Sequence, residues 1–280
     1  MSDNKLRNTV KKFLFPVQFK FRQLVGGNRM NPSFIIVGAQ KAGTTSLYKY
    51  LTQHPEIKPT LLKEVHYFDL NYDKPLSWYK SFFPLERNNK KITGEASPYY
   101  MFHPFAIKRI AEFNPNMKII VLLRDPANRA ISHYYHEARK GREKLGMREA
   151  FDAEQERLEG EQDRFKINPN YISNNYQRFS YKSRGLYANQ IKAIKENFKE
   201  SNILIIDSKD FFKQTKSTVQ EVLEFVGVNK NFDIKTEKRF NVGNNIKDPR
   251  EEQLYSELKE FYKEHNETLY KIIGRRFNWN

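Results

Sequence analysis

An apolar run that leads through a glycine loop into a helix sets the strongest constraint on the fold. Residues 34–37 read Phe-Ile-Ile-Val and end at Gly38, as expected of a strand buried in a parallel sheet. Residues 44–54 have helical character, and His54-Pro55 stops the predicted helix. A strand, a glycine loop and a helix in this order predict an anion-binding turn inside an α/β domain.

The same alternation of strands and helices continues to the end of the chain. Strands that alternate with helices indicate an α/β fold, here a single P-loop-like domain whose central parallel sheet carries helices on both faces. No internal repeat or low-complexity linker divides the chain, so we predict one domain over residues 32–280. The predicted strands are 91–93 continuing into 94–98, 118–123 and 203–206, the predicted helices are 127–140, 186–198 and 251–273, and residues 147–164 form an acid-rich amphipathic segment.

Residues 1–31 form a basic, aromatic N-terminal arm ahead of this domain. Phe13, Phe15, Phe19 and Phe21 stand among lysine and arginine residues, and Pro16 interrupts either a strand or a helix. Such a segment can lie on an anionic membrane surface, or it can pack against its own domain. The sequence leaves both roles open.

Composition restricts the class of partner and the kind of chemistry. The chain has no cysteine, which excludes disulfides, thiolate metal sites and a cysteine nucleophile. Forty-nine Lys and Arg against 33 Asp and Glu give a formal charge of +16, which favours a nucleic acid, an anionic lipid, a phosphorylated cofactor or an acidic glycan. With no apolar run of membrane-spanning length and no secretory h-region, we expect a cytoplasmic location, with the arm as a route to the inner membrane surface.

The glycine loop differs from the loop that binds nucleoside triphosphates in the position of its cation. Gly38 and Gly43 have the spacing of G-x-x-x-x-G-K-[ST], but Thr44 stands where that motif carries lysine. The cation here is Lys41, inside the loop. A lysine at this place can reach a bridging oxygen on which charge develops as a phosphorus–oxygen–sulfur linkage breaks.

A second motif follows the predicted strand 118–123. Arg124-Asp125-Pro126 begins it, with Asp125 as a helix cap and Pro126 at the first helical position, and Ser132 lies on the helix that follows. An arginine at the carboxyl end of a parallel strand is well placed to bind phosphate. The run Lys-Ala-Gly-Thr-Thr-Ser at 41–46, together with Arg-Asp-Pro-x-x-Arg-x-x-Ser-x-Tyr at 124–134, resembles the sulfotransferases that use 3′-phosphoadenosine 5′-phosphosulfate (PAPS).

This resemblance implies the donor and the residues that bind it. The loop would hold the 5′-phosphosulfate, Arg124 and Ser132 would hold the 3′-phosphate, and Tyr187 would lie near the donor cleft. Residues 241–245 are a further candidate to cover the donor. The full set of expected donor-binding residues is Lys41, Ala42, Gly43, Thr44, Thr45, Ser46, Arg124, Ser132 and Tyr187.

A third segment suggests the general base. Residues 63–69, Lys-Glu-Val-His-Tyr-Phe-Asp, resemble a segment of the glycan-modifying sulfotransferases, in which the glutamate takes the acceptor's proton. Carried onto this chain, Glu64 is the base, and Lys41 and His66 are the other expected catalytic residues. Partial burial that raised the pKa of Glu64 would suit this task. His66 is the competing base, because imidazole titrates near neutrality.

The acceptor is less constrained than the donor. Ala96 stands where the heparan sulfate enzymes carry a lysine, a departure that argues against a heparan-type acceptor. A glycan, a glycolipid or another hydroxylated metabolite all fit, with transfer to a hydroxyl or an amine. Residues 147–182, rich in tyrosine and arginine, are the candidate acceptor wall.

Two other classes of protein compete with a sulfotransferase. A P-loop kinase or NTPase would need a lysine after Gly43 and an acidic residue that ends a strand to hold Mg²⁺. A basic nucleic-acid- or membrane-binding protein would use the charge alone, but no helix-turn-helix, zinc or RNA-binding motif is present, so we expect no nucleic acid partner. No metal-ligand spacing is found in the sequence, so we expect no metal.

Overall fold

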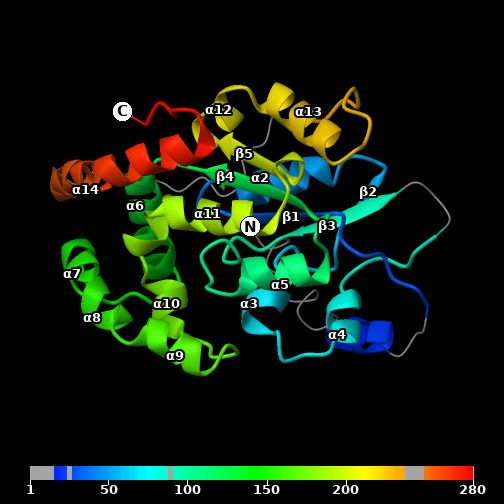
Figure 1. Ribbon diagram of the computed structural model, residues 1–280, viewed down its shortest axis with the longest axis horizontal. Coiled ribbons are helices and arrows are strands. Elements are labelled where there is room, and N and C mark those ends of the chain that lie inside the picture. Colours follow the sequence, from blue (N-terminus) through cyan, green and yellow to red (C-terminus); the bar gives the residue numbers. More distant parts are fainter. Residues whose placement is uncertain (1–15, 24–26, 88–90, 237–248, 280) are drawn as a thin grey trace, which may run out of the picture.

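A five-stranded parallel sheet forms the centre of the molecule. The computed structural model describes residues 16–23, 27–87, 91–236 and 249–279 of the 280. The strand order is β2-β3-β1-β4-β5, and every neighbouring pair is parallel (Figure 1). The strands are β1 Phe34–Gly38, β2 Ile57–Lys58, β3 Ile92–Ala96, β4 Lys118–Leu123 and β5 Ile203–Asp207.

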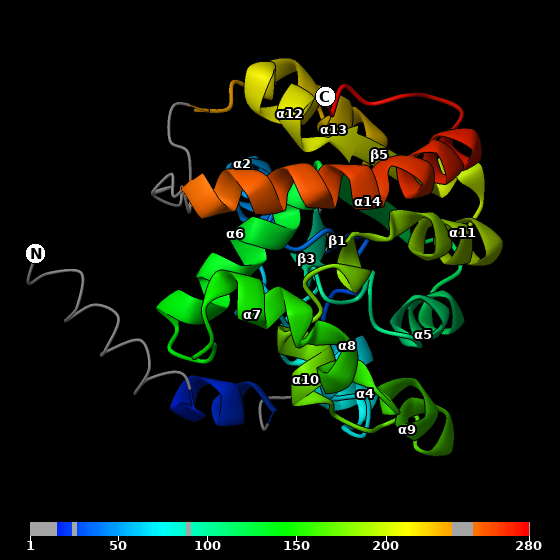
Figure 2. The same cartoon turned by 90° about the vertical axis from the view of Figure 1, so that its left-hand side faces the viewer.

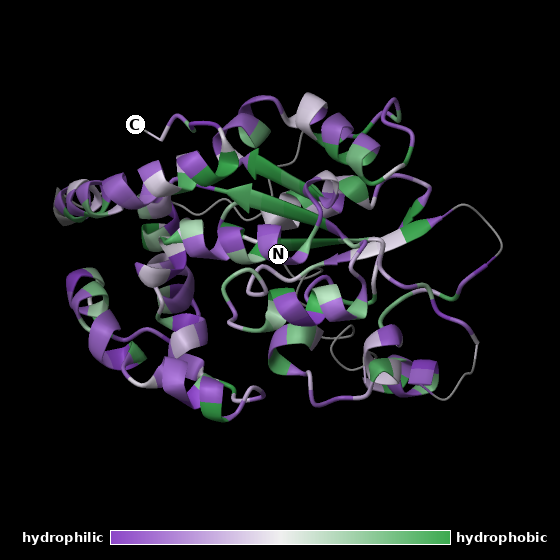
Figure 3. Cartoon of the chain, in the orientation of Figure 1, coloured by the Kyte–Doolittle hydropathy of each residue, from purple (hydrophilic) through white to green (hydrophobic). Residues whose placement is uncertain are grey.

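The sheet is the apolar core that the sequence predicts. Every residue of β1 is buried, as are residues 119–123 of β4, and Figure 3 shows these strands as an apolar band inside a more polar shell of helices. A strand covered on both faces needs such a continuous apolar run. The two-residue strand β2 was not predicted, because it is too short to show any periodicity.

The register brings the ends of the strands to one edge. Ile36 of β1 lies opposite Ala96 of β3 and Ile120 of β4, and Leu123 of β4 lies opposite Asp207 of β5. The loops that follow β1, β3, β4 and β5 therefore start side by side. In open α/β sheets this carboxyl edge is where ligands bind.

Helices cover both faces of the sheet, which confirms the predicted fold class. Figure 2 shows the sheet between α2 on one side and α11 with α5 on the other. The first face carries α2 Thr44–Leu51, α12 Ser208–Lys213 and α13 Thr215–Phe225, and the second carries α5 Ala106–Phe113 and α11 Tyr187–Asn197. Helix α2 ends three residues before the predicted stop at His54.

Helix α6 (Pro126–Arg139) starts where β4 ends and leads away from the sheet. The Asp125 carboxylate caps it by accepting a hydrogen bond from the backbone N–H of Asn128 at 2.7 Å, and Pro126 occupies the first turn, as predicted. The long helix α14 (Pro249–Ile273) packs beside α6 and α11. These contacts fix the direction in which α6 presents its side chains.

A group of short helices forms a second lobe beside α6. The acid-rich segment 147–164 is divided among three helices, with Gly160 in the left-handed region at φ 71° before the last of them. The lobe consists of α7 Met147–Asp152, α8 Glu154–Leu158, α9 Glu161–Ile167 and α10 Asn174–Arg178, followed by the 3₁₀ turn η1 Ser183–Gly185. The remaining short elements are α3 Tyr67–Leu70, α4 Leu76–Lys80 and η2 Glu200–Asn202.

The described part of the N-terminal arm is a helix that packs on its own domain. Over residues 16–23, Phe19 contacts the rings of Trp78 and Phe82, with ring centroids 5.9 and 4.6 Å away, and the Arg22 guanidinium donates to the Ser81 carbonyl at 2.8 Å. Residues 1–15 and 24–26 of the predicted arm lie outside the described residues. No helix in the described ranges is long and apolar enough to cross a bilayer.

Candidate active site

A cavity of about 710 Å³ lies at the carboxyl edge of the sheet. The loop after β1, the start of α6, the end of β5 and the end of α10 border it, together with Glu64 and His66. Residues from the donor motifs and from the predicted base segment therefore share one cavity. Its lining includes Gln40, Lys41, Gly43, Thr44, Thr45, Glu64, His66, Tyr99, Arg124, Asn128, Ser132, His136, Glu137, Lys140, Arg142, Gln177, Arg178 and Arg184.

The loop after β1 has the conformation that an anion-binding turn requires. Gly43 precedes α2 at φ 103°, and a Cβ there would lie 2.9 Å from the Phe212 ring, so only glycine fits. Lys41 also lies in the left-handed region, at φ 72°. The Arg124 guanidinium donates to the Lys41 carbonyl at 3.1 Å and so joins the two donor motifs.

Not every expected loop residue reaches the cavity. Gln40, Lys41, Gly43, Thr44 and Thr45 line it. Ala42 and Ser46 are buried and are absent from the lining, so the structure places them as support for the loop. A side chain there packs on the core instead of facing a ligand.

The Lys41 ammonium lies in a strongly cationic environment. Burial lowers its pKa to about 8, and the positive charges of Arg139, Arg124 and Lys140 add to this effect, while Glu137 opposes it. A site that destabilises its own ammonium group lacks negative charge. Such a site is suited to an anionic ligand.

Helix α6 lines the cavity with one stripe of side chains. Asn128, Ser132, His136 and Lys140 recur every four residues and all face the cavity. With a rise of about 1.5 Å per residue, the stripe from Asn128 to Lys140 runs roughly 18 Å along the cavity wall. Arg124 and Ser132 lie toward the helix start, where a phosphate is favoured.

Tyr187 does not lie in the cavity lining, contrary to its expected place among the donor-binding residues. Its side chain is buried, and its hydroxyl donates to the Arg124 carbonyl at 3.0 Å. The residue therefore braces the strand end that carries Arg124. Residues 241–245, the other donor-covering candidate, lie outside the described residues.

Glu64, His66 and Asp69 form a chain of charged contacts at the cavity wall. The His66 Nδ1–H donates to the Asp69 carboxylate at 2.8 Å, and His66 Nε2 lies 3.4 Å from the Glu64 Oε2. Lys63 contacts the other Glu64 oxygen and donates to the Thr45 hydroxyl at 2.9 Å. The base segment is thus linked directly to the donor loop. Asp69 was not among the predicted site residues, although the quoted segment contains it.

The charges along this chain decide between the two candidate bases. Burial favours a raised pKa for Glu64, but the contacts with His66 and Lys63 outweigh it and lower the pKa to about 2, so Glu64 does not have the raised pKa that would suit a base. For His66, burial alone would lower the pKa, but the contacts with the Asp69 and Glu64 carboxylates outweigh this effect and raise the pKa to about 10. At neutral pH the imidazole is protonated and the Glu64 carboxylate is ionised. Only the carboxylate can accept a proton.

A buried carboxylate that the sequence reading missed holds the base segment in place. Glu95 of β3 is fully buried and accepts hydrogen bonds from the Tyr79 hydroxyl and the Ser97 hydroxyl, both at 2.7 Å, and from the Val65 backbone N–H at 3.3 Å. Burial raises its pKa to about 7. Because Val65 follows Glu64 directly, Glu95 fixes the backbone that carries the base.

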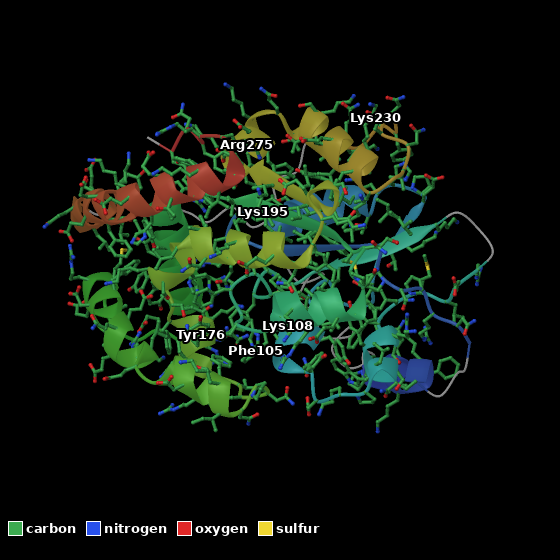
Figure 4. The ribbon with its side chains drawn as sticks, viewed as in Figure 1. Phe105, Lys108, Tyr176, Lys195, Lys230 and Arg275 are labelled. Carbon is green, nitrogen blue, oxygen red and sulfur yellow. The ribbon has the colours of Figure 1, made fainter. Side chains whose placement is uncertain are left out.

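None of the aromatic residues of the candidate acceptor wall, residues 147–182, is among those that line the cavity. Tyr176 and Tyr181 are buried, and Tyr176 shares an apolar cluster with Phe105, both labelled in Figure 4. Gln177 and Arg178 are the residues of α10 that line the cavity. The remaining residues of the predicted wall, Arg164, Lys166, Tyr171, Phe179 and Lys182, are not among those that line it.

Strained backbone coincides with the site. Among the described residues other than glycine, positive φ occurs at Lys41 and at His66, with φ 72° and 55°. Residues held in this region cost about 1–3 kcal/mol each and tend to mark functional sites. Within the described ranges no cluster of three or more His, Asp or Glu side chains could hold a metal ion.

A phosphate loop with an internal lysine, a strand-end arginine and a carboxylate in one cavity define a transferase that handles a phosphorylated donor. The family model described as the sulfotransferase domain matches residues 31–273, and the chain belongs to that family. The crystal structure of a sulfotransferase from Alicyclobacillus acidocaldarius superposes with a TM-score of 0.71 at 29% identity, over 89% of this chain and 98% of that one.

Three curated relatives are eukaryotic proteins. The membrane-associated sulfotransferase kil1 of Dictyostelium discoideum is 26% identical over 89% of this chain, and the human heparan sulfate glucosamine 3-O-sulfotransferase 6 is 28% identical over 90%. The chain spans 66% of the length of the first and 75% of the second. It spans 30% of the mouse bifunctional heparan sulfate N-deacetylase/N-sulfotransferase 4, at 29% identity.

Proposed function

We propose that this protein transfers a sulfuryl group from PAPS to a hydroxyl of a glycan. The observation that carries this proposal is the shared cavity, in which Lys41 of the donor loop, Arg124 at the end of β4 and the ionised Glu64 face one space. Membership of the sulfotransferase family supports the donor, and the heparan sulfate enzymes among the relatives support a glycan acceptor.

The reaction is an in-line displacement at sulfur. Glu64 takes the proton of the acceptor hydroxyl, the oxygen forms a bond to sulfur, and the bond from sulfur to the bridging oxygen breaks. Adenosine 3′,5′-bisphosphate (PAP) leaves with the negative charge on that oxygen. Lys41 and the loop N–H groups stabilise this charge, so the protein contributes mainly positioning and electrostatic stabilisation.

Charge on the acceptor side favours an acidic glycan over a neutral one. Lys140 and Arg178 line the cavity, and no hydrogen bond or ion pair involves either side chain within the described ranges. Arg142 is already paired with Glu137 at 3.2 Å. Two unpaired cations in the cavity that also holds Glu64 suit a carboxylate or sulfate on the sugar chain.

Calorimetric titration of PAP into the protein and into Arg124→Ala tests the donor site. Removing a guanidinium that binds phosphate costs about 1.5–3 kcal/mol, so we expect PAP affinity to fall about 10- to 150-fold. Arg148→Ala is the matched control, because that arginine pairs with Glu257 at the surface, away from the cavity. Its affinity for PAP should equal that of the unaltered protein.

Titration with two further ligands distinguishes a sulfotransferase from a kinase. Adenosine 5′-phosphate lacks the 3′-phosphate and should bind weakly, and ATP with Mg²⁺ should not compete with PAP. If the unaltered protein prefers ATP with Mg²⁺, or binds no PAP, the sulfotransferase proposal is wrong and a kinase becomes the better reading.

We also propose that the N-terminal helix lies on an anionic membrane from the cytoplasmic side. Phe19 and Arg22 fix residues 16–23 to the domain, while Val17 and Phe21, one turn apart, are 68% and 64% exposed on the outer side together with Lys20. An outward apolar pair beside a lysine, on a chain of charge +16, fits an anionic lipid surface.

Sedimentation with lipid vesicles tests this location. We expect the full chain to bind vesicles of phosphatidylcholine with phosphatidylglycerol and not vesicles of phosphatidylcholine alone. Replacing Val17 and Phe21 together by serine should lower binding about tenfold or more, because two inserted apolar side chains are lost. Ile167→Ser, which removes an 85% exposed apolar residue of α9, should change nothing. Equal losses in both variants would contradict the proposed face.

A further inference from the structure

Arg184 of η1 connects the donor loop to the acceptor side of the cavity. The residue is buried, with 2% of its surface exposed, yet it contributes to the cavity lining. Its Nη1 donates to the Gln40 side-chain oxygen in the donor loop, and its Nη2 donates to the Gln177 carbonyl at 2.7 Å and the Tyr176 carbonyl at 3.1 Å. One guanidinium therefore holds two walls together.

No carboxylate forms an ion pair with this guanidinium among the described residues, and the buried Glu137 acts on its charge only from beyond ion-pair distance. All its hydrogen-bond acceptors are neutral, and its buried Nε has no acceptor. The rings of Tyr99 and Phe102 lie 5.1 and 4.8 Å from its central carbon, which favours a cation but does not neutralise it. A buried charge without a partner is normally destabilising.

A second buried arginine adds to the positive charge beside Arg184. Arg129 is also fully buried, donates to the Tyr181 carbonyl, and leaves its Nε and Nη1 without acceptors within the described ranges. His133 beside them is buried too, and burial, with the charges of Arg184 and Arg129, keeps its pKa well below the usual value. The cluster stabilises an anion that enters the cavity in front of it, in a medium where charges interact strongly.

The contacts with the donor loop indicate which anion this is. Gln40 directly precedes Lys41, and Arg184 lies on the Gln40 side of the loop, together with Tyr99 and Gln177. Arg124 and Ser132, suited to a distant phosphate, come from the end of β4 and the start of α6 instead. In a donor bound in this way, the group nearest to both Lys41 and the candidate acceptor wall is the sulfuryl group, which is the group transferred.

We propose that Arg184 and Gln40 form the subsite for the sulfuryl oxygens of the donor. This inference rests on the proposed function and adds to it. Arg184 orients the Gln40 amide, so that the amide N–H₂ is free to donate while its oxygen is held. Its charge, which no ion pair neutralises, favours a donor that carries the sulfuryl group over PAP, which lacks it.

Competition binding with PAP and PAPS, in the absence of acceptor, tests the subsite. In Arg184→Gln we expect affinity for PAPS to fall about tenfold or more, with affinity for PAP changed less than about threefold, because only PAPS places charge at the subsite. The melting temperature is measured alongside, because the substitution removes a buried charge without an ion pair and also the three hydrogen bonds that join the two walls. Arg164→Gln, an exposed arginine of α9, is the matched control and should change neither affinity.

Two further variants keep the test decisive. Gln40→Ala removes the loop amide without altering the buried arginine, and it should give the same selective loss of PAPS affinity even if Arg184→Gln folds poorly. Arg184→Lys, which keeps the charge, should recover part of the selectivity. An equal loss of PAP and PAPS affinity, or no loss in either of the Gln40 and Arg184 variants, overturns the subsite. Failure of the unaltered protein to bind PAP would instead overturn the proposed function.

Discussion

Replacing Glu64 by glutamine should lower kcat for sulfuryl transfer about 10²- to 10⁴-fold, the usual contribution of a general base. Glutamine has the same shape and can still accept a hydrogen bond from Lys63, but it cannot take the acceptor's proton. Donor affinity should stay within about twofold, because Glu64 contacts Lys63 and His66 and not Arg124 or Ser132. Initial rates with labelled PAPS and a uronic-acid oligosaccharide measure the first quantity, and PAP titration measures the second.

The His66 variant separates the two candidate bases. His66→Asn removes the contact with Asp69 and releases Glu64, so we expect a smaller loss, about tenfold, from a base that is less well oriented. If His66→Asn is inactive while Glu64→Gln keeps most of its activity, the imidazole is the base.

The pH dependence gives an independent test of the same assignment. With the pKa of Glu64 lowered to about 2, the carboxylate loses its proton far below neutrality, so kcat/KM should show no acid limb between pH 5 and 7. A neutral imidazole base would require kcat/KM to rise with pH as the imidazolium, whose pKa is raised to about 10, gives up its proton. Between pH 5 and 7 the carboxylate assignment therefore predicts a level kcat/KM, and the imidazole assignment predicts one that rises with pH.

The sequence predicted those parts of the fold and site that depend only on residues close together along the chain. The apolar runs of β1 and β4 needed only their own composition, and the start of α6 needed only Asp125 and Pro126. The parallel sheet then brought Lys41 and Arg124 together, because both follow a strand at its carboxyl end. Two motifs 83 residues apart were thus placed correctly by topology alone.

The other features of the site depend on contacts between residues far apart in the sequence, and no spacing in the sequence shows such contacts. Glu95 holds the Val65 backbone from 30 residues away, and Arg184 reaches Gln40 across 144 residues. A raised pKa would suit Glu64 as the base, but the folded chain puts Lys63 and His66 against its carboxylate, and these contacts lower the pKa. Tertiary packing also decides the place of the tyrosines in the candidate acceptor wall. An aromatic residue that lies near a cation in the sequence is more often packed in the core than exposed to a ligand.

The Lys41 ammonium is the group whose loss should affect the leaving oxygen most directly. We expect Lys41→Met to lower kcat about 10²- to 10³-fold, the effect of removing one preorganised donor from a developing anion. Methionine keeps much of the length of the side chain but removes the charge and the donor. PAP affinity should fall less than kcat, because the charge on the bridging oxygen develops fully only as the sulfuryl group departs.

Because the pKa of Lys41 is lowered, the role of its ammonium group can be tested in the unaltered enzyme through the pH dependence of the reaction. Burial and the surrounding cations bring that pKa down to about 8, so the ammonium is lost as the pH rises through about 8 instead of near 10. Because kcat/KM reports the free enzyme, it should fall above pH 8, and saturation with the anionic donor should move the fall in kcat to higher pH. Lys41→Arg keeps its charge throughout this range, so its kcat/KM should stay level where that of the unaltered enzyme falls. The same alkaline fall in Lys41→Arg would assign it to another group and leave Lys41 without the proposed role.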